Sequence, residues 1–274
     1  MKSEKIKFNG LSNCRDLGGF KGIDGKVTVP RTVFRSDSLD LIDDDDARRL
    51  KDEFGLKYVV DLRSEKEISA FPDKKIEGVT YYCMPAQDEK FDREAYPHKK
   101  YDLLDKRMNS NVEFLFHWDK DGDSIKGMEL NYIERMHGKK PKESFKRFFE
   151  LLADSSGATL FHCHEGKDRT GILTALYLGV LGVSEDDIIE DYLATNVYFT
   201  KKIADRKKHL DEVAHLSPED PMYSSLIILM GVHKVWIDAA LNEIKKAGGF
   251  EEYLLNEVNL APETIAKIRD KYLK

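Results

Sequence analysis

The sequence predicts an α/β protein: one domain, residues 1–274, with a central, largely parallel sheet, helices on both faces and a helical lid. Residues 158–162 form a short apolar run, as in a buried strand, and residues 172–181 are apolar on nearly all sides, as in a buried helix. Upstream, short apolar runs alternate with helical patterns, the order that builds a parallel sheet. With 274 residues and 41% hydrophobic content, the chain is long enough to bury a full core.

The upstream elements can be assigned in chain order. We expect a hairpin over 20–29 around Asp24-Gly25, a strand over 32–35, a helix over 43–54 and strands over 58–62 and 79–84. The acidic run 43–46 could be taken for a metal cluster. Acidic residues at a helix start complement the helix dipole, however, and we favour that interpretation.

Two segments depart from this alternation and are candidates for a lid over the site. Residues 87–130 are charged and too long for an ordinary connection in a compact domain, so we interpret them as an insertion. Ser184 and Asp187 form a capping pair for a helix through Tyr192. After it, residues from about 195 to 225 mix lysines with apolar side chains and are expected to complete the lid.

The most informative segment lies between the strand at 158–162 and the helix that follows, where residues 162–171 read His-Cys-His-Glu-Gly-Lys-Asp-Arg-Thr-Gly. A helix N-terminus has free N–H groups and a positive dipole, so it favours an anion. The same field lowers the pKa of a thiol, and Cys163 is therefore expected to be largely thiolate at neutral pH. Arg169 offers a planar fork of donors to two phosphate oxygens, and Thr170 offers a hydroxyl to the sulfur. We predict a phosphate site that contains its own nucleophile.

A nucleotide-binding loop and a zinc site both fit these ten residues less well. A nucleotide-binding P-loop needs Gly at 161 and Ser or Thr at 168, where this chain has Phe161 and Asp168. A zinc site built from residues 162–164 fits poorly because adjacent ligands diverge and the chain has no Cys-x2-Cys pair. We therefore expect no metal and no other cofactor at this site.

The loop resembles the signature of the Cys-based protein tyrosine phosphatase superfamily, and its Lys-Asp before Arg169 is similar to the bacterial branch of atypical tyrosine and lipid phosphatases. Further blocks are similar to that branch in the same order: NCRDLGG at 13–19, FRSD at 34–37, VVDLRS at 59–64 and DYLATN at 191–196. The resemblance spans roughly residues 10–200. It implies a protein tyrosine phosphatase-like fold and a phosphomonoesterase that works without a metal.

The chemistry implied by this resemblance assigns roles to named residues. Cys163 would attack the phosphate in line, Arg169 would clamp it, and water would hydrolyse the resulting cysteinyl-phosphate. A general acid must protonate the leaving oxygen. Asp168 lies where the resembled branch carries an Asp proposed for this role, and we favour it. Asp119, after Trp118, is the alternative, because it resembles the Trp-Pro-Asp loop of conventional tyrosine phosphatases without its proline.

The other loop residues bear on the substrate. His164, Glu165 and Gly166 are expected to line the phosphate pocket together with Lys167 and Thr170. Lys167 could pair with a second phosphate, which favours phosphoinositides, whereas the carboxylate of Glu165 would repel highly charged head groups. We therefore predict a phosphotyrosine protein as substrate and keep a phosphoinositide or dual-specificity phosphatase as the alternative. A non-catalytic phosphoprotein-binding module is less favoured, because nucleophile and clamp are both intact.

Further candidate residues lie outside the loop. Asp16, Arg35, Asp37, Asp61 and Arg63 match blocks that pack around the loop in the family, and among them Asp37 is the best candidate for the substrate site. His162 is expected to orient the loop by hydrogen bonds. Cys14, or with less support Cys83, could trap oxidised Cys163 as a disulfide if it lies nearby.

Composition narrows the class of protein and its location. A net charge of −6 argues against a nucleic-acid partner, for which a basic patch would be expected. No stretch approaches the ~18 apolar residues of a membrane span, and residues 1–10 have no continuous apolar region of a signal peptide. Three cysteines make no disulfide framework. We expect a cytoplasmic protein, or a secreted one if a signal peptide has been removed.

Overall fold

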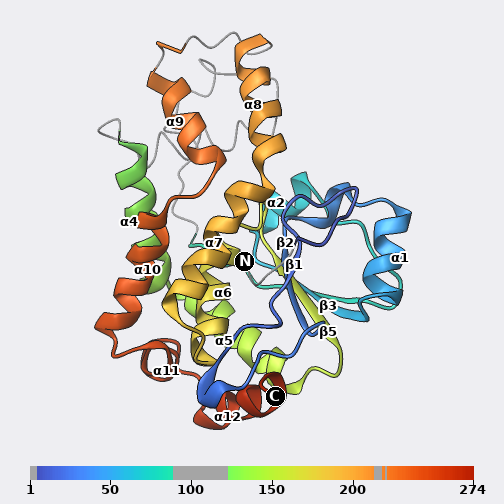
Figure 1. Cartoon of the computed structure of the whole chain (residues 1–274), viewed down its shortest axis with the longest axis vertical. Helices are drawn as coiled ribbons and strands as arrows, with labels where there is room; N and C mark the ends of the chain where they lie inside the picture. Colours follow the sequence, from blue (N-terminus) through green and yellow to red (C-terminus); the bar gives the residue numbers. More distant parts are fainter. Residues whose placement is uncertain (1–4, 89–122, 213–217, 220) are drawn as a thin grey trace.

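A five-stranded sheet forms the centre of the molecule, in the order β1-β2-β5-β3-β4 (Figure 1). The computed structural model describes residues 5–88, 123–212, 218–219 and 221–274. The strands are β1 Arg15–Asp16, β2 Val33–Ser36, β3 Leu56–Asp61, β4 Thr80–Cys83 and β5 Ala158–His162. All pairings are parallel except that of β1 with β2 at one edge. The predicted α/β class with a largely parallel sheet is confirmed.

The register of the three inner strands brings their carboxyl ends together. His162 at the end of β5 is level with Ser36 at the end of β2 and with Asp61 at the end of β3. In a parallel sheet, ligands bind outside the carboxyl ends of the strands. The segments that follow these three strands therefore meet at one edge, and the cysteine loop lies in the middle.

Helices cover both faces of the sheet, and side chains on the strands alternate between two hydrophobic clusters. Val33, Val60 and Phe161 belong to the larger cluster, whereas their strand neighbours Phe34 and Val59 belong to the smaller one. Figure 1 shows α1 on one side of the sheet and α4, α5, α6 and α10 on the other. The helices are α1 Asp44–Asp52, α2 Glu65–Ala70, α4 Ser124–His137, α5 Lys139–Asp154, α6 Asp168–Val180, α7 Glu185–Tyr198, α8 Thr200–Glu212, α9 Pro221–Met230, α10 Lys234–Lys246, α11 Phe250–Glu252 and α12 Pro262–Tyr272, with short turns η1 Ile23–Gly25, η2 Leu39–Leu41 and the π-helical η4 Tyr253–Glu257.

Most helix starts follow from the sequence. The Asp43 carboxylate accepts from the N–H of Asp46 and caps α1, which confirms the dipole interpretation of the acidic run. Ser184 likewise caps α7, although this helix continues to Tyr198, past the predicted end. The turn at Asp24-Gly25 is present, but its flanks pair only through an isolated bridge between Lys21 and Val27 rather than as an extended hairpin.

The predicted insertion at 87–130 needs a correction at its end. Asp123 accepts from the N–H of Lys126 and caps α4, so residues from 124 onward form a helix of the core, with Met128 buried. The polar composition around Asp123, which is also typical of a loop, belongs here to the helix cap. Residues 89–122 lie outside the described part of the chain.

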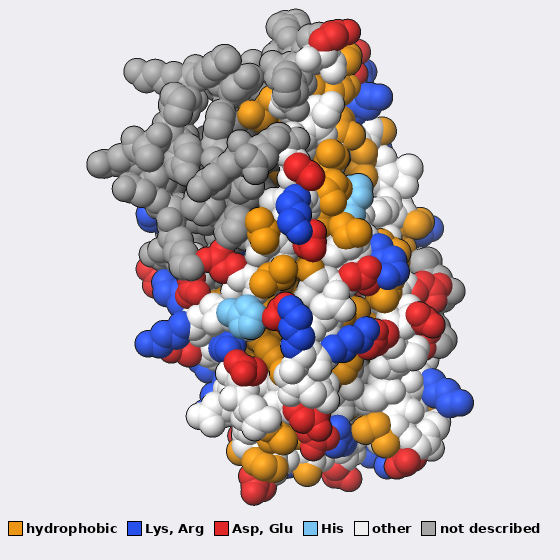
Figure 2. Space-filling model, turned by 90° about the vertical axis from the view of Figure 1, so that its left-hand side faces the viewer, with side chains coloured by type: hydrophobic (Ala, Val, Ile, Leu, Met, Phe, Trp, Pro, Cys, Tyr) orange, Lys and Arg blue, Asp and Glu red, His pale blue; other side chains and the backbone are white. Residues whose placement is uncertain are grey.

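The surface that carries α4 and α10 shows acidic and basic side chains interleaved with apolar ones (Figure 2). Pairs such as Lys234 with Asp238 contribute to this pattern. Among the described residues, no single helix has the length and apolar composition of a membrane span; α9 and α10 taken together, which meet at 64°, pass that test by length and composition only.

Candidate functional site

The loop from Cys163 to Lys167 connects β5 to α6, as predicted, and lies at the N-terminus of that helix. Cys163 is 3% exposed and packs with the larger hydrophobic cluster. Asp168 begins α6, so Arg169 and Thr170 belong to its first turn. The strand before the loop and the helix after it are both buried, which fixes the two ends of the loop.

Three consecutive carbonyls of the loop, those of residues 164–166, are held outward by neighbouring segments. The carbonyl of His164 accepts from the N–H of Ser38 at 3.1 Å. The carbonyls of Glu165 and Gly166 accept from Nδ2 of Asn13 at 3.1 and 3.0 Å. The carbonyl of Gly166 also accepts from Nη2 of Arg35 at 2.7 Å. The peptide bonds of the described residues are trans, so each N–H in this loop points opposite to the C=O of its own peptide unit. The N–H groups of residues 165–167 therefore point to the inner side of the loop, where an anion would be held.

Gly166 is the position at which this loop demands a glycine. Its φ is +65°, and a Cβ there would lie 2.0 Å from the carbonyl oxygen of Ser36. We expect Gly166→Ala to lower the free energy of unfolding by about 2–4 kcal/mol, from backbone strain plus overpacking, and to abolish activity. Urea denaturation would measure the first effect. Gly55→Ala is the matched control, because Gly55 has φ +64° but no atom within 4 Å of the Cβ; an equal loss in both variants would contradict the clash.

The residues that hold the loop are themselves fixed by buried ion pairs and hydrogen bonds. Asp191 on α7 bridges Arg15 and Arg35, with N···O distances of 2.8 and 2.7 Å. The carboxylate of Asp37 accepts from the N–H groups of Ser12 and Asn13. Asp37 thus fixes Asn13 beneath the loop, and its place in the substrate site stays a prediction.

Arg169 is oriented by a bidentate ion pair with Glu67, the third residue of α2. Its Nη1 and Nη2 donate to the two carboxylate oxygens at 2.7 and 2.6 Å, and Nη1 also contacts the carbonyl of Leu62 at 3.4 Å. Glu67 in turn forms a capping box with Ser64. These contacts use three of the five guanidinium donors and leave Nε–H and the second Nη2–H, which lie side by side on one edge of the group. That edge can take two phosphate oxygens.

Electrostatics favour the thiolate of Cys163. Burial alone would raise the pKa of this thiol, but the charge of Arg169 and contributions from the hydroxyl and N–H of Thr170 outweigh it, and the pKa is lowered. Apart from this effect on Cys163, the buried Thr170 hydroxyl forms no hydrogen bond with the described residues. It can therefore serve the sulfur alone, which is the role that the sequence suggested for it.

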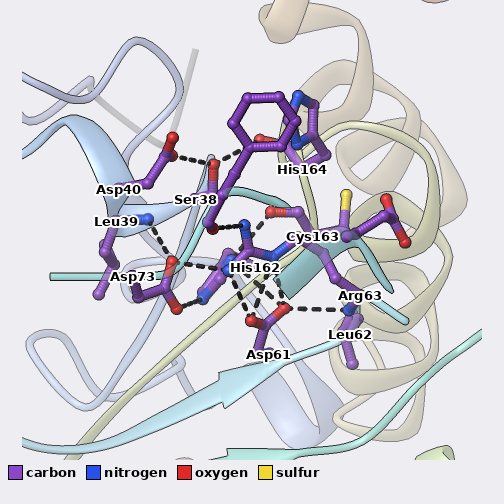
Figure 3. Close-up of polar contacts among 12 residues, drawn as sticks. Ser38, Leu39, Asp40, Asp61, Leu62, Arg63, Asp73, His162, Cys163 and His164 are labelled. Carbon is purple, nitrogen blue, oxygen red and sulfur yellow. Dashed lines mark hydrogen bonds and ion pairs between the residues drawn. The ribbon is translucent and has the colours of Figure 1, made fainter. Parts of the chain in front are cut away.

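Behind the loop lies a buried cluster of two acids and two bases (Figure 3). Arg63 pairs with Asp61 and Asp73 at 2.7 and 2.8 Å, and His162 pairs with Asp73 at 3.0 Å. Nδ1 of His162 also lies 2.9 Å from the carbonyl oxygen of Cys163. Asp61, Asp73 and His162 are close enough together to hold a metal ion, but the two carboxylates are already paired with two cationic side chains, Arg63 and His162. The cluster fixes the backbone of the nucleophile, in line with the orienting role predicted for His162.

His162 makes stability depend on pH. Burial would lower its pKa, but Asp61 and Asp73 raise it to about 9. Because the folded pKa lies above the unfolded value near 6.5, this stabilisation is complete below pH 6.5 and is lost as pH rises through 9. We expect the loss to reach at most about 3 kcal/mol. Urea unfolding at pH 6 and 9.5 would show it in the wild type and much less in His162→Gln; equal pH dependence in both proteins would contradict the assignment.

Asp168 belongs to a chain of hydroxyl groups. The hydroxyl of Tyr132 on α4 donates to Oδ1 of Asp168 at 2.8 Å, and the hydroxyl of Tyr192 on α7 lies 2.7 Å from that of Tyr132. Burial, and then the charge of Asp168, raise the pKa of both tyrosines far above the usual value, so both remain protonated donors. The carboxylate of Asp168 is thereby positioned through one oxygen, and the other remains for a proton.

Glu165 and Lys167 are buried and paired with each other, and both are tied to the helices that follow α7. Oε2 of Glu165 lies 3.0 Å from Nζ of Lys167, and its Oε1 lies 3.2 Å from Lys202 and 2.5 Å from Arg206, both on α8. Nζ of Lys167 also donates to the carbonyl of Leu229 on α9. These cations lower the pKa of Glu165, against the effect of burial. Glu165 is thus a neutralised anchor, and the predicted repulsion of charged head groups is corrected.

The remaining predicted residues lie as follows. The ring of His164 packs edge-on against Phe71 at 5.3 Å, at the side of the loop. Cys14 belongs to the smaller hydrophobic cluster whereas Cys163 belongs to the larger, and burial raises the pKa of the Cys14 thiol strongly. Burial and the raised pKa both disfavour the thiolate of Cys14. Cys83 lies exposed on the edge strand β4. Asp119 lies outside the described residues.

The sequence interpretation missed several residues that build the site: Ser38, Glu67, Asp73 and Tyr132. Of these, Glu67 had a local signal, because Ser64-x-x-Glu67 is a capping box directly after a matched block. The others have no local signature, since they act through residues far along the chain.

Comparison with known proteins agrees with this geometry. The sequence model of the tyrosine phosphatase family matches residues 6–274. A protein of Cupriavidus necator, provisionally named a tyrosine-protein phosphatase, is 28% identical over 272 residues, which cover 98% of this chain and 88% of the relative. The triple specificity protein phosphatase PtpB of Mycobacterium tuberculosis is 25% identical over 93% of this chain and 97% of its own length. A tyrosine-protein phosphatase of Nostoc commune is 29% identical over 58% of this chain and 47% of its own. This chain belongs to the tyrosine phosphatase family.

Proposed function

We propose that this phosphatase hydrolyses phosphotyrosine through a cysteinyl-phosphate and without a metal. The observation that carries the proposal is the joint arrangement in one loop of a buried thiol with a lowered pKa, three inward N–H groups and the open edge of Arg169. Each of these favours the negative charge of a phosphate or of its transition state. Nucleophile and anion cradle are thus positioned before substrate arrives.

The two chemical steps use residues of the loop. In the first, the thiolate of Cys163 attacks phosphorus, the P–O bond to the phenol breaks, and the protonated carboxyl of Asp168 gives its proton to the leaving oxygen. In the second, the Asp168 carboxylate takes a proton from water as that water attacks phosphorus. The S–P bond breaks, and orthophosphate and the thiolate of Cys163 are released.

The substrate class follows less directly, and one observation favours the second candidate, a phosphoinositide. Glu165 is surrounded by three cations, those of Lys167, Lys202 and Arg206. These four side chains together carry three positive charges and one negative charge. A substrate with further phosphates would be attracted rather than repelled. The family and the deep position of Cys163, which suits a long planar side chain, support phosphotyrosine, and the surplus of positive charge supports phosphoinositide as an additional substrate.

The contacts of Glu165 and Lys167 with α8 and α9 also support the lid hypothesis. Figure 1 shows these two helices extending beyond the end of the sheet. We propose that they form the lid and that opening it breaks the ion pairs of Glu165. We further propose a reducing cytoplasmic location, because the chemistry needs a free thiol and all three cysteines are free.

The experiment is release of phosphate, with chelator present, from a phosphotyrosine peptide, a phosphoserine peptide and a panel of phosphoinositides. We expect the phosphotyrosine peptide to have the highest kcat/KM. Faster hydrolysis of the lipids would make the cations near Glu165 decisive and assign the enzyme to lipid substrates. Loss of all activity with chelator would overturn the metal-independent mechanism.

A further inference from the structure

Arg135, in the last turn of α4, is a buried cation with open hydrogen-bond donors. Arg135 is only 8% exposed, and its Nε and Nη1 have no hydrogen-bond partner among the described residues. Nη2 has one distant acceptor, Oε1 of Gln87 at 3.4 Å. Buried polar groups are nearly always paired, and a guanidinium more than most, so this exception needs a reason.

The surroundings place this guanidinium beside the catalytic loop. Arg135 follows Tyr132 by three positions on the same helix, and the hydroxyl of Tyr132 holds Asp168. Gln87, its distant acceptor, follows Ala86, whose N–H donates at 3.0 Å to the same Leu62 carbonyl that Arg169 contacts. Burial and then the charge of Arg169 lower the pKa of Arg135, whereas Asp168, Tyr132 and Cys163 oppose that shift. Two guanidinium groups thus approach the loop from neighbouring positions.

Arg135 differs from the other two cations near the loop, Arg169 and Lys167, in having no acidic partner among the described residues. Arg169 is paired with Glu67, and Lys167, on the other side of the loop, is paired with Glu165. Among the described residues no carboxylate forms a hydrogen bond with Arg135. Leaving charged donors unpaired destabilises the fold, and such destabilisation is typical of positions kept for a ligand.

We propose that Arg135 binds a second anionic group of the substrate, close to the phosphate being hydrolysed. The planar fork of arginine matches the paired oxygens of a phosphate or a carboxylate, so either group could be bound. The proposal rests on the proposed function in one respect, because it places the scissile phosphate in the loop of Cys163. It makes Arg135 a residue that determines which phosphorylated molecules are preferred.

The test is titration calorimetry with small anions on the inactive Cys163→Ser protein, with and without Arg135→Met. Orthophosphate fills the loop alone, pyrophosphate adds a second phosphate, and phosphoglycolate adds a carboxylate. We expect Arg135→Met to weaken pyrophosphate binding about 10–100-fold and orthophosphate binding less than about threefold. A parallel loss with phosphoglycolate would extend the site to carboxylates, and a loss with pyrophosphate alone would restrict it to phosphates.

Controls separate the ways in which this idea could fail. Lys126→Met removes an exposed cation from the same helix and is expected to change no affinity. Arg135→Lys, which keeps the charge, should recover part of the pyrophosphate affinity. If orthophosphate binds but Arg135→Met leaves the pyrophosphate affinity unchanged, the proposed role of Arg135 is refuted while the phosphate site in the loop stands. If orthophosphate does not bind, the loop holds no phosphate and both proposals fall.

Thermal unfolding gives a second, independent readout. A structural arginine stabilises the fold, and its replacement lowers Tm. An arginine with open buried donors destabilises the unliganded fold, so we expect Arg135→Met to raise Tm by about 2–6 °C. A fall in Tm together with unchanged anion affinity would show that the side chain is structural.

Discussion

Replacement of Cys163 by Ser is expected to lower kcat for p-nitrophenyl phosphate by at least about 10⁴-fold, because a serine hydroxyl in this loop has no base to activate it and the charge of Arg169 no longer stabilises a thiolate. The affinity for orthophosphate should remain or increase, since Arg169 and the inward N–H groups are retained and a negative charge is removed. Steady-state kinetics and titration calorimetry would measure the two quantities. Activity within tenfold of the wild type would rule out a covalent step at Cys163.

The lowered pKa of Cys163 has its own measurable consequence. Alkylation by iodoacetamide follows the thiolate fraction, so the rate at Cys163 should reach half its maximum at a lower pH than the rate at Cys83. Cys83 is the internal control, because this residue is exposed to reagent while partial burial of its thiol, and then the charge of Asp61, raise its pKa. Orthophosphate should protect Cys163 and leave Cys83 unaffected. Identical pH profiles for both thiols would contradict the electrostatic argument.

The parts of this structure that could be predicted from sequence are those in which neighbours along the chain determine the outcome. The strand at 158–162, the helix after it and the loop between them are local features, and the loop carries its chemistry in ten consecutive residues. Caps such as Asp43 and Ser184 likewise act within one turn of their helices. A capping residue can still be misread, as at Asp123, when the polar residues before it suggest a loop.

The partners of each charged side chain, and therefore the net effect of its charge, could not be predicted in the same way. Glu165 looks repulsive in sequence, but α8 brings Lys202 and Arg206 to it, and the charge is neutralised. Glu67 and Arg169 are 102 positions apart, so only the register of β3 with β5 brings α2 to the loop. Long-range pairs of this kind depend on the packing of whole elements, which periodicity does not encode.

Replacement of Asp168 by Asn is the second large effect that we expect, and its size should depend on the leaving group. For a phosphotyrosine peptide, whose phenol is a poor leaving group, kcat should fall about 10²–10⁴-fold, because the leaving oxygen loses its proton donor. For p-nitrophenyl phosphate, whose leaving group needs little protonation, the first step should be much less affected. Rapid-mixing kinetics of phenol release would separate this step from hydrolysis of the intermediate.

Asp119→Asn decides between the two candidate acids. If Asp168 is the acid, Asp119→Asn should affect both substrates alike and weakly. If the dependence on leaving group appears in Asp119→Asn and is absent from Asp168→Asn, the assignment is wrong and the upstream loop supplies the proton.

Tyr132→Phe tests the positioning of the same carboxyl group. The phenol donates to Oδ1 of Asp168 at 2.8 Å, which leaves Oδ2 to carry the proton. Without this donor the carboxyl group can rotate, so kcat for the poor leaving group should fall by about tenfold. Tyr192→Phe, one hydroxyl further from Asp168, should have the smaller effect. An order of effects in which Tyr192→Phe exceeds Tyr132→Phe would mean that the hydroxyl chain supports the packing of α4 on α7 rather than the proton donor.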